Sequence, residues 1–299
     1  MRQIQMKARA KINLGLDVIG KRPDGYHDLR MVMQTVNLYD TVKLSVTRSP
    51  GVRIKTNLKF LPTDRTNHAF QAAQMLLEEF GIADGVFIDL TKHIPVAAGL
   101  AGGSTDAAAV LEGMNRLFDL GLSKEALRER GVKIGADVPY CILKGTALAE
   151  GIGEELTVLP PVPDCSIVIA KPDVRVSTKF VYTHLSLDEH TKHPQIDAQI
   201  AAIRAHDLEK MCALCGNVLE EVTIPAHPEI AGLKEEMRSG GALAAMMSGS
   251  GPSVFGVFED RKKAEQVYHA LKKKPERIQV FLTEPYNPSG VSPASAGGE

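Results

Sequence analysis

The segment IPVAAGLAGGSTDAAAVL, residues 94–111, constrains the fold of this chain more than any other. It follows a β-type run and leads into an alanine-rich stretch that predicts a helix. Glycines tolerate positive φ and let consecutive backbone N–H groups turn toward one point. A helix that begins at the capping residue types Ser104, Thr105 and Asp106 directs the positive end of its dipole to that point. The pattern therefore predicts an anion site, with a phosphate chain favoured over the alternative of a plain flexible loop.

This loop lacks the marks of the two commonest phosphate-binding loops. A Walker A loop ends in Gly-Lys-Ser/Thr, whereas Gly103 is followed by Ser104 with no lysine near. The positions of Gly99, Gly102 and Gly103 do not give the GxGxxG spacing of a dinucleotide fold. The charge of a nucleotide must then be met by backbone groups, the helix dipole, a metal ion or distant lysines. A β-branched residue at Gly102 is expected to project into the space of the phosphates.

Composition limits the partners of the chain. Its 35 lysines and arginines nearly balance 36 aspartates and glutamates, so no global basic field exists to attract nucleic acid or an anionic membrane. No stretch approaches about 18 apolar residues, and the charged N-terminal segment does not resemble a signal peptide. These features predict a cytoplasmic protein with no nucleic-acid partner and no membrane partner.

Four cysteines, Cys141, Cys165, Cys212 and Cys215, are expected to be reduced thiols in such a protein. The pair Cys212-x-x-Cys215 could indicate redox or zinc chemistry, but it lies in a stretch of helical apolar spacing with no second CxxC pair. Packed thiols on a helix are the favoured interpretation, and any metal ligands stay unknown.

The order of strand-like and helical patterns predicts an α+β fold in two domains. The proline-rich segment 159–165 predicts a crossing between domains, which places them at 1–158 and 159–285, followed by a disordered tail over 286–299. The N-terminal part is expected to contain short strands over 3–10, 12–18, 30–36 and 41–48. Helices are predicted over 67–80, 124–130, 177–185, 195–205, 208–222, 228–239 and 261–272.

Three further segments carry polar residues or glycines between apolar runs. The sequence SGSGPSVFG at 248–256 predicts a hairpin turn or, because its small residues expose backbone, a second phosphate contact. Lys11 and Asn13 share one face of a strand, which indicates either a solvated edge or the wall of a polar pocket. Asp137, in a glycine–aspartate–proline turn, could be a local cap, a general base or a metal ligand.

Together these segments resemble the GHMP kinase superfamily. The resemblance covers nearly the whole chain through KINLGL, the central PxxxGLAGGSTDAAA loop and SGSGPSVFG. It implies a two-domain α+β fold with an N-terminal domain like ribosomal protein S5 domain 2 and a C-terminal ferredoxin-like α/β sandwich. The longer stretches KINLGLDVIGKRPDGYHDL, IGADVPYCILKGTALAEGIGE and KPDVRVSTKFVY are similar to the members that act on a cytidine-diphosphate-linked alcohol.

The resemblance implies an ATP-dependent kinase that phosphorylates the 2-hydroxyl of a cytidine-diphosphate-linked methylerythritol in the non-mevalonate supply of isoprenoid precursors. Asp137 corresponds to the catalytic base, and Lys11 to the lysine that stabilises charge on it and on the transferring phosphoryl group. Mg²⁺ is expected to accompany ATP, with Ser104 as a candidate contact. The partners would be these small molecules, and the protein a monomer or homodimer.

The resemblance also assigns binding residues. Asn67 matches a position near the adenosine, Asn13 would hold the erythritol part, and His27 would hydrogen-bond the cytosine edge, with Tyr26 and Tyr182 stacked on the ring. The ATP phosphates would lie along Pro95, Val96, Ala97, Ala98, Gly99, Leu100, Ala101, Gly102, Gly103, Ser104 and Thr105. The second glycine segment, Ser248, Gly249, Ser250 and Gly251, would contact the alcohol substrate.

Two rival functions share these loops. Homoserine kinase has no need of a cytosine clamp, so Tyr26, His27 and Tyr182 argue against it. A GHMP-fold sensor would bind a small molecule without turnover, but Lys11 and Asp137 argue against that, because a sensor has no use for a proton acceptor.

Overall fold

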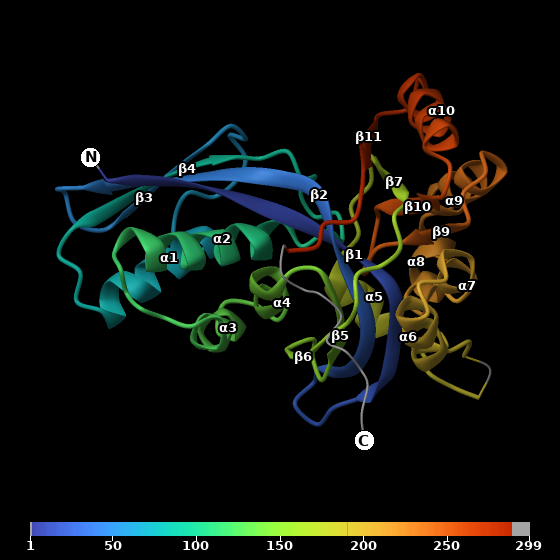
Figure 1. The fold of residues 1–299 in the computed structure, drawn as a ribbon, viewed down its shortest axis with the longest axis horizontal. Helices are drawn as coiled ribbons and strands as arrows, with labels where there is room; N and C mark the ends of the chain where they lie inside the picture. The colour runs from blue at the N-terminus through green and yellow to red at the C-terminus, as the bar shows by residue number, and fades with distance from the viewer. Residues whose placement is uncertain (1, 190, 289–299) are drawn as a thin grey trace. The chain divides into compact units, whose positions relative to one another are not determined.

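The computed structural model describes residues 2–189 and 191–288, and the chain divides into two compact units (Figure 1). The first comprises residues up to Ala10, Leu38–Val96 and Ala101–Leu143. The second comprises Lys11–Asn37, Ala97–Leu100 and the chain from Lys144 onward. Each unit is therefore built from three separate segments of the chain. The division into domains at 1–158 and 159–285 stays a prediction.

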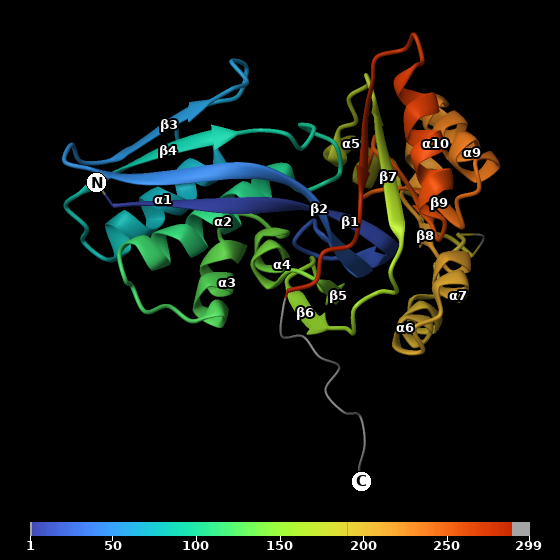
Figure 2. The same ribbon diagram turned by 45° about the horizontal axis from the view of Figure 1, so that its top comes forward.

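The first unit packs helices against a sheet. Its strand order is β3-β4-β2-β1, with β4 antiparallel to β2 and parallel to β3. The helices lie on one side of these strands (Figure 2), and Gly113 lets α2 approach closely, since a Cβ there would lie 2.6 Å from Leu44 Cδ1. The elements are β1 (Gln3–Lys21), β2 (His27–Thr47), β3 (Val52–Thr56), α1 (His68–Glu79), β4 (Gly85–Thr91), α2 (Gly102–Leu117), α3 (Lys124–Val132) and α4 (Val138–Leu143).

The N-terminal strands are longer than predicted. The four short strands expected from 3 to 48 are two long ones, β1 and β2, which pass through both units. Lys11 does not interrupt β1, because its side chain is buried and its backbone N–H donates to Leu100 O at 3.2 Å. An apolar–polar pattern marks a strand locally but does not show where two adjacent segments join.

The second unit holds the rest of the strands. β5 (Thr146–Glu150) pairs with β2 and β6 (Glu155–Val158), and β8 (Gly216–Asn217) pairs with β1 in parallel. A separate antiparallel sheet has the order β11-β7-β10-β9, from β7 (Ser166–Pro172), β9 (Ala244–Met247), β10 (Val254–Phe258) and β11 (Ile278–Thr283). The helices of this unit are α5 (Thr178–His184), α6 (Ile196–Arg204), α7 (Leu208–Ala213), α8 (Glu220–Ala226), α9 (Glu229–Ser239) and α10 (Arg261–Lys272).

The single helix predicted over 208–222 is wrong. α7 ends at Ala213, β8 pairs with Gly15 and Leu16, and α8 begins only at Glu220. The apolar spacing satisfied a helical pattern, but pairing with β1 takes precedence over local propensity.

The predicted disordered tail over 286–299 lies mostly outside the described residues. Its first residue is paired, because Tyr286 N–H donates to Thr35 O at 2.8 Å. Within the described ranges, no helix combines the length and the apolar content that crossing a membrane requires.

Candidate active site

The glycine loop has an unusual backbone. Ala97, Gly99 and Ala101 all have positive φ, at 51°, 73° and 55°. Helix α2 begins directly afterwards at Gly102, and Ala101 at the N-cap supplies no side-chain hydrogen bond. The first N–H groups of a helix have no partner inside it, so this uncapped end presents donors to an anion.

The prediction that Ser104, Thr105 and Asp106 cap this helix is wrong. All three lie inside α2, because the left-handed Ala101 starts the helix earlier. The Thr105 hydroxyl instead donates to Arg9 O at 2.7 Å. Asp106 turns inward and is buried. The helix end is thus left without a side-chain cap.

Asp106 belongs to a buried charge cluster with Lys92 and Asp40. Lys92 Nζ donates to Asp40, to Asp106 Oδ2 at 2.5 Å and to Gly102 O at 3.3 Å. Asp40 Oδ1 accepts from the backbone N–H groups of His93 and Ile94. The cluster therefore ties the residues before the loop to the first residue of α2. The sequence interpretation missed Lys92 and Asp40, although a charged residue between apolar strand positions was the available signal.

The cluster holds two carboxyl groups for one ammonium group. Burial, together with the charge of Asp40, raises the pKa of Asp106 to about 8 despite the opposing effect of Lys92. Burial lowers the pKa of Lys92, but the charges of Asp106 and Asp40 outweigh burial and raise it overall. Asp106 Oδ1 is buried without a hydrogen-bond partner among the described residues. A protonated Asp106 beside the ammonium group of Lys92 fits this arrangement.

We expect Asp106→Asn to weaken the pH dependence of stability. Between the ordinary value of 3.8 and the folded value of about 8, native Asp106 keeps a proton that the unfolded chain has lost. This site therefore makes the free energy of unfolding fall as pH rises through that window, by at most about 1.4 kcal/mol per pH unit. Asparagine cannot titrate, so urea unfolding at pH 5, 6.5 and 8 should give a flatter profile for the variant. Parallel profiles would contradict the assignment.

Within the second unit the two glycine segments meet backbone to backbone. Ser248 Oγ donates to Gly99 O at 2.9 Å, and a Cβ on Gly99 would lie 2.0 Å from Ser248 O. The segment 248–253 also joins β9 to β10, with Ser248 N–H donating to Ser253 O at 2.9 Å. The hairpin interpretation of this segment is therefore right as local structure, while its contact with a substrate stays a prediction.

Gly102 faces the protein interior. A Cβ there would lie 3.2 Å from Ile94 Cγ2 and 3.3 Å from Lys92 Nζ. The expectation that a β-branched side chain at this position projects into the phosphate space is therefore corrected, because it would press on the buried cluster. In this loop it is Gly99 that must lack a side chain, because the backbone of Ser248 lies too close to leave room for a Cβ.

Lys11 and Asn13 form a buried polar pair on β1. Lys11 Nζ donates to Asn13 Oδ1 at 2.8 Å, and Asn13 Nδ2 contacts Met31 Sδ at 3.4 Å. Both side chains are buried, so the solvated-edge alternative for Lys11 is wrong. Asn13 also lies near the second glycine segment, since a Cβ on Gly249 would be 3.7 Å from Asn13 Oδ1.

Asp137 and Asn67 each precede a helix of the first unit. Asp137 lies directly before α4, where its carbonyl accepts from Cys141 N–H at 3.0 Å. Asn67 is the N-cap of α1, because its Oδ1 accepts from Ala69 N–H and its Nδ2 donates to Pro62 O. Capping alone accounts for the position of Asn67, and its contact with adenosine stays a prediction.

Two of the three predicted clamp residues are in contact. The rings of His27 and Tyr182 lie 5.1 Å apart with an interplanar angle of 34°. Burial lowers the pKa of His27, and the nearby Lys21 lowers it further, which favours the neutral imidazole. A neutral imidazole both donates and accepts, as the edge of a cytosine requires. Tyr26 is 60% exposed, in a turn where its N–H donates to Asp24 Oδ1.

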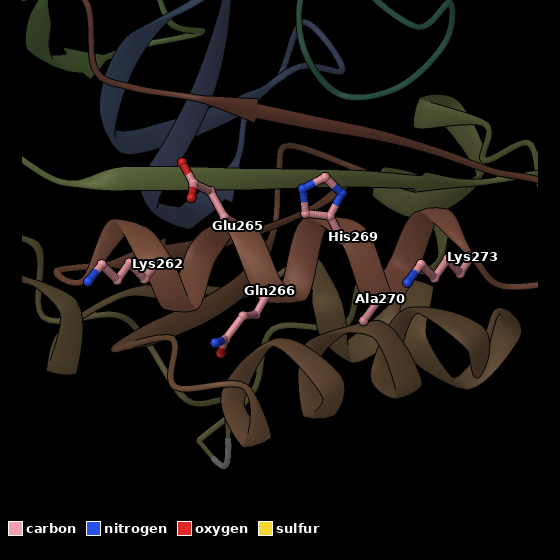
Figure 3. A pocket seen from close by; sticks show the side chains of 6 residues that line it. All are labelled: Lys262, Glu265, Gln266, His269, Ala270 and Lys273. Carbon is pink, nitrogen blue, oxygen red and sulfur yellow. The ribbon is translucent and has the colours of Figure 1, made fainter.

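Three of the cysteine thiols are buried and unsuited to chemistry. Burial raises the pKa of Cys165 and Cys215 to about 12 and also raises that of Cys212, so these thiols are packed and unreactive. No group of three or more potential metal ligands occurs in the part of the chain that the structure describes. A hollow on α10 contains none of the predicted site residues (Figure 3); it is lined by Lys262, Glu265, Gln266, His269, Ala270 and Lys273.

Two family models match the chain. The model for the GHMP kinases N terminal domain matches residues 67–145, and the model for GHMP kinases C terminal matches residues 199–277. These ranges include the glycine loop, Asp137 and the second glycine segment. The chain therefore belongs to the GHMP kinase family.

Relatives within this family have a shared name. A 4-diphosphocytidyl-2-C-methyl-D-erythritol kinase from Lachnoclostridium phytofermentans is 56% identical over 288 residues, which cover 96% of this chain and 99% of that protein. One of the same name from Geobacillus kaustophilus is 51% identical and covers 90% of this chain and 93% of its own. A crystal structure of 4-(cytidine 5'-diphospho)-2C-methyl-D-erythritol kinase is 32% identical, with a TM-score of 0.81 over 95% of this chain and all of that chain.

Structural likeness extends to more distant kinases. A homoserine kinase from Cytophaga hutchinsonii has a TM-score of 0.78 over 95% of each chain at 22% identity, which shows the shared fold alone. The predicted α+β class and GHMP kinase fold are confirmed.

Proposed function

We propose that this chain is the kinase that phosphorylates the 2-hydroxyl of 4-diphosphocytidyl-2-C-methyl-D-erythritol, with ATP as the phosphoryl donor, in the non-mevalonate supply of isoprenoid precursors. The observation that carries the proposal is 56% identity to a protein of that name over 96% of the chain. The contact between His27 and Tyr182 supports it, because homoserine and mevalonate offer no aromatic base to such a pair.

Two residues carry the chemistry in this proposal. Asp137 accepts the proton of the substrate hydroxyl as the oxygen attacks the γ-phosphorus of ATP, the bond from that phosphorus to the β,γ-bridging oxygen breaks, and ADP leaves. Lys11, buried beside Asn13, supplies positive charge for the phosphoryl group as it transfers. Catalysis then comes mainly from positioning and electrostatic stabilisation, as is general for phosphoryl transfer.

The glycine loop supplies the donors for the ATP phosphates. Three left-handed residues and the uncapped start of α2 support this role. Mg²⁺ keeps several waters and is held largely by substrate phosphates, so the described residues fit it without a dedicated cluster of carboxylates. Ser104 at the start of α2 is the candidate protein contact, and the metal would neutralise phosphate charge. The cytoplasmic location and the monomeric or homodimeric state stay predictions.

We expect replacement of Tyr182 by alanine to weaken binding of the cytidine substrate. Loss of the stacking ring should raise KM for that substrate by about 5-fold or more, because base–aromatic stacking is worth about 1–3 kcal/mol. KM for ATP should stay nearly unchanged. Tyr26→Ala should act in the same direction, and its exposed side chain makes a folding defect a poor explanation. Equal effects on both substrates would identify these tyrosines as structural residues.

The function is tested by coupled ADP release. The purified protein is assayed with 4-diphosphocytidyl-2-C-methyl-D-erythritol, homoserine and mevalonate side by side, and phosphorus NMR identifies the product. We expect turnover with the first alcohol and a new phosphate monoester at its 2-position. Preferential turnover of homoserine or mevalonate would overturn the proposal, and absence of turnover with all three would favour a sensor.

A further inference from the structure

The second glycine segment is held in place by residues that run from the end of β8 into α8. Asn217 is buried, and its Nδ2 donates to two carbonyl oxygens of the loop, Met247 O at 2.9 Å and Gly249 O at 2.8 Å. Its Oδ1 accepts from Leu219 N–H at 3.0 Å. These three hydrogen bonds use both N–H donors and the oxygen acceptor of the side-chain amide, a set of groups that only glutamine also carries.

Two neighbouring side chains also form hydrogen bonds with this loop. Glu220 Oε1 accepts from Met247 N–H at 2.8 Å, and Glu220 Oε2 is paired with Lys234. Thr223 Oγ1 donates to Ser250 O at 3.4 Å. The backbone around Met247–Ser250 is thus bonded on several sides by one short segment, 217–223.

This segment also connects to the strand that carries Asn13. Asn217 is the register partner of Leu16, and Val218 N–H donates to Leu16 O at 3.1 Å. One buried amide therefore links β1 to the loop whose Ser248 donates to Gly99 O. Gly249, one of the two residues whose carbonyl it fixes, also lies near Asn13, since a Cβ on Gly249 would be 3.7 Å from Asn13 Oδ1.

We infer that Asn217 is a positioning residue for the alcohol substrate, acting through the two loop carbonyls that its amide fixes. This inference rests on the proposed function, in which Asn13 and the segment 248–251 contact that substrate. Without the amide, the loop carbonyls are free to turn, and the backbone facing the substrate loses its fixed geometry.

The test is Asn217→Asp, which keeps the shape and the acceptor for Leu219 N–H but replaces the donor. A carboxylate oxygen facing two carbonyl oxygens repels them, so hydrogen exchange at 247–253 should accelerate at least 10-fold. KM for the cytidine substrate should rise about 10-fold, with KM for ATP changed less than about 2-fold. Thr223→Val removes only the longer hydrogen bond to Ser250 O, so exchange at 247–253 and KM for the cytidine substrate should each rise about 2-fold. This variant tests whether segment 217–223 fixes the loop if Asn217→Asp does not fold.

Asn115→Asp is the matched control. Asn115 lies in the first unit, where its amide donates to Leu122 O and accepts from Leu122 N–H, both at 2.9 Å. The control should lower stability without changing either KM or the exchange at 247–253. Unchanged exchange at 247–253 in a folded Asn217→Asp protein, or the same KM pattern in the control, would overturn the inference. The exchange measurement needs no substrate, so it decides whether Asn217 fixes the loop even if the wild-type protein does not phosphorylate the cytidine alcohol, whereas the KM values test the effect on the substrate.

Discussion

Asp137→Asn should reduce kcat by on the order of 10²-fold or more, because the substrate hydroxyl loses its proton acceptor. The amide has nearly the same shape as the carboxylate, and the carbonyl of residue 137 still accepts from Cys141 N–H. Folding and binding of an ATP analogue should therefore persist. Steady-state kinetics gives kcat, and calorimetric titration gives the affinity for the analogue.

A helix-capping carboxylate provides the control for this prediction. Asp260 caps α10 by accepting from Lys262 N–H at 2.7 Å, and asparagine caps a helix about as well as aspartate. Asp260→Asn should therefore leave kcat unchanged. If Asp137→Asn is equally mild, Asp137 is only a residue of the turn before α4, and the base must be sought elsewhere.

Gly99→Ala should reduce turnover by more than about 100-fold and also weaken the ATP analogue. The new Cβ would lie 2.0 Å from Ser248 O and 3.2 Å from Gly251 O, so the two glycine segments must move apart. A φ of 73° adds strain of about 1–2 kcal/mol for any residue with a side chain. Turnover, analogue titration and thermal unfolding together separate displacement of the loop from a general loss of stability.

Gly121→Ala is the control that separates the close contact with Ser248 from the backbone strain of a positive φ. Gly121 has a similar φ of 68°, but a Cβ there would have no neighbour within 4 Å. It should lower stability by the strain alone and leave kcat and both KM values unchanged. If Gly99→Ala is no worse than Gly121→Ala in turnover, the close approach of the two loops is not required for activity.

The sequence identified the local elements that depend on short-range patterns. The helix predicted over 261–272 matches α10, because its amphipathic spacing and the residues that bound it lie within a few positions of each other. Its motifs also predicted the GHMP kinase fold, which the family models confirm. The roles of the site residues stay predictions.

Elements whose structure depends on residues distant in the chain could not be predicted from local patterns. The helix predicted over 208–222 is interrupted because Gly216 and Asn217 pair with β1, about 200 residues away in the chain. Lys92 and Asp40 are 52 residues apart, and nothing in the sequence indicates that they meet. The pairing of β2 with β4 brings them together beside Asp106. A pattern of apolar residues reports burial, but it does not report which buried charges meet.

The sequence by itself thus determined that a glycine loop precedes a helix, because glycine frequency and helical propensity are local properties. Only the tertiary structure decided what each position in that loop faces. Gly102 faces Lys92 and Ile94, while Gly99 faces the backbone of Ser248. The direction of a missing side chain depends on the φ and ψ of its own residue and on which distant segment packs there. Those quantities are fixed only when the whole chain folds.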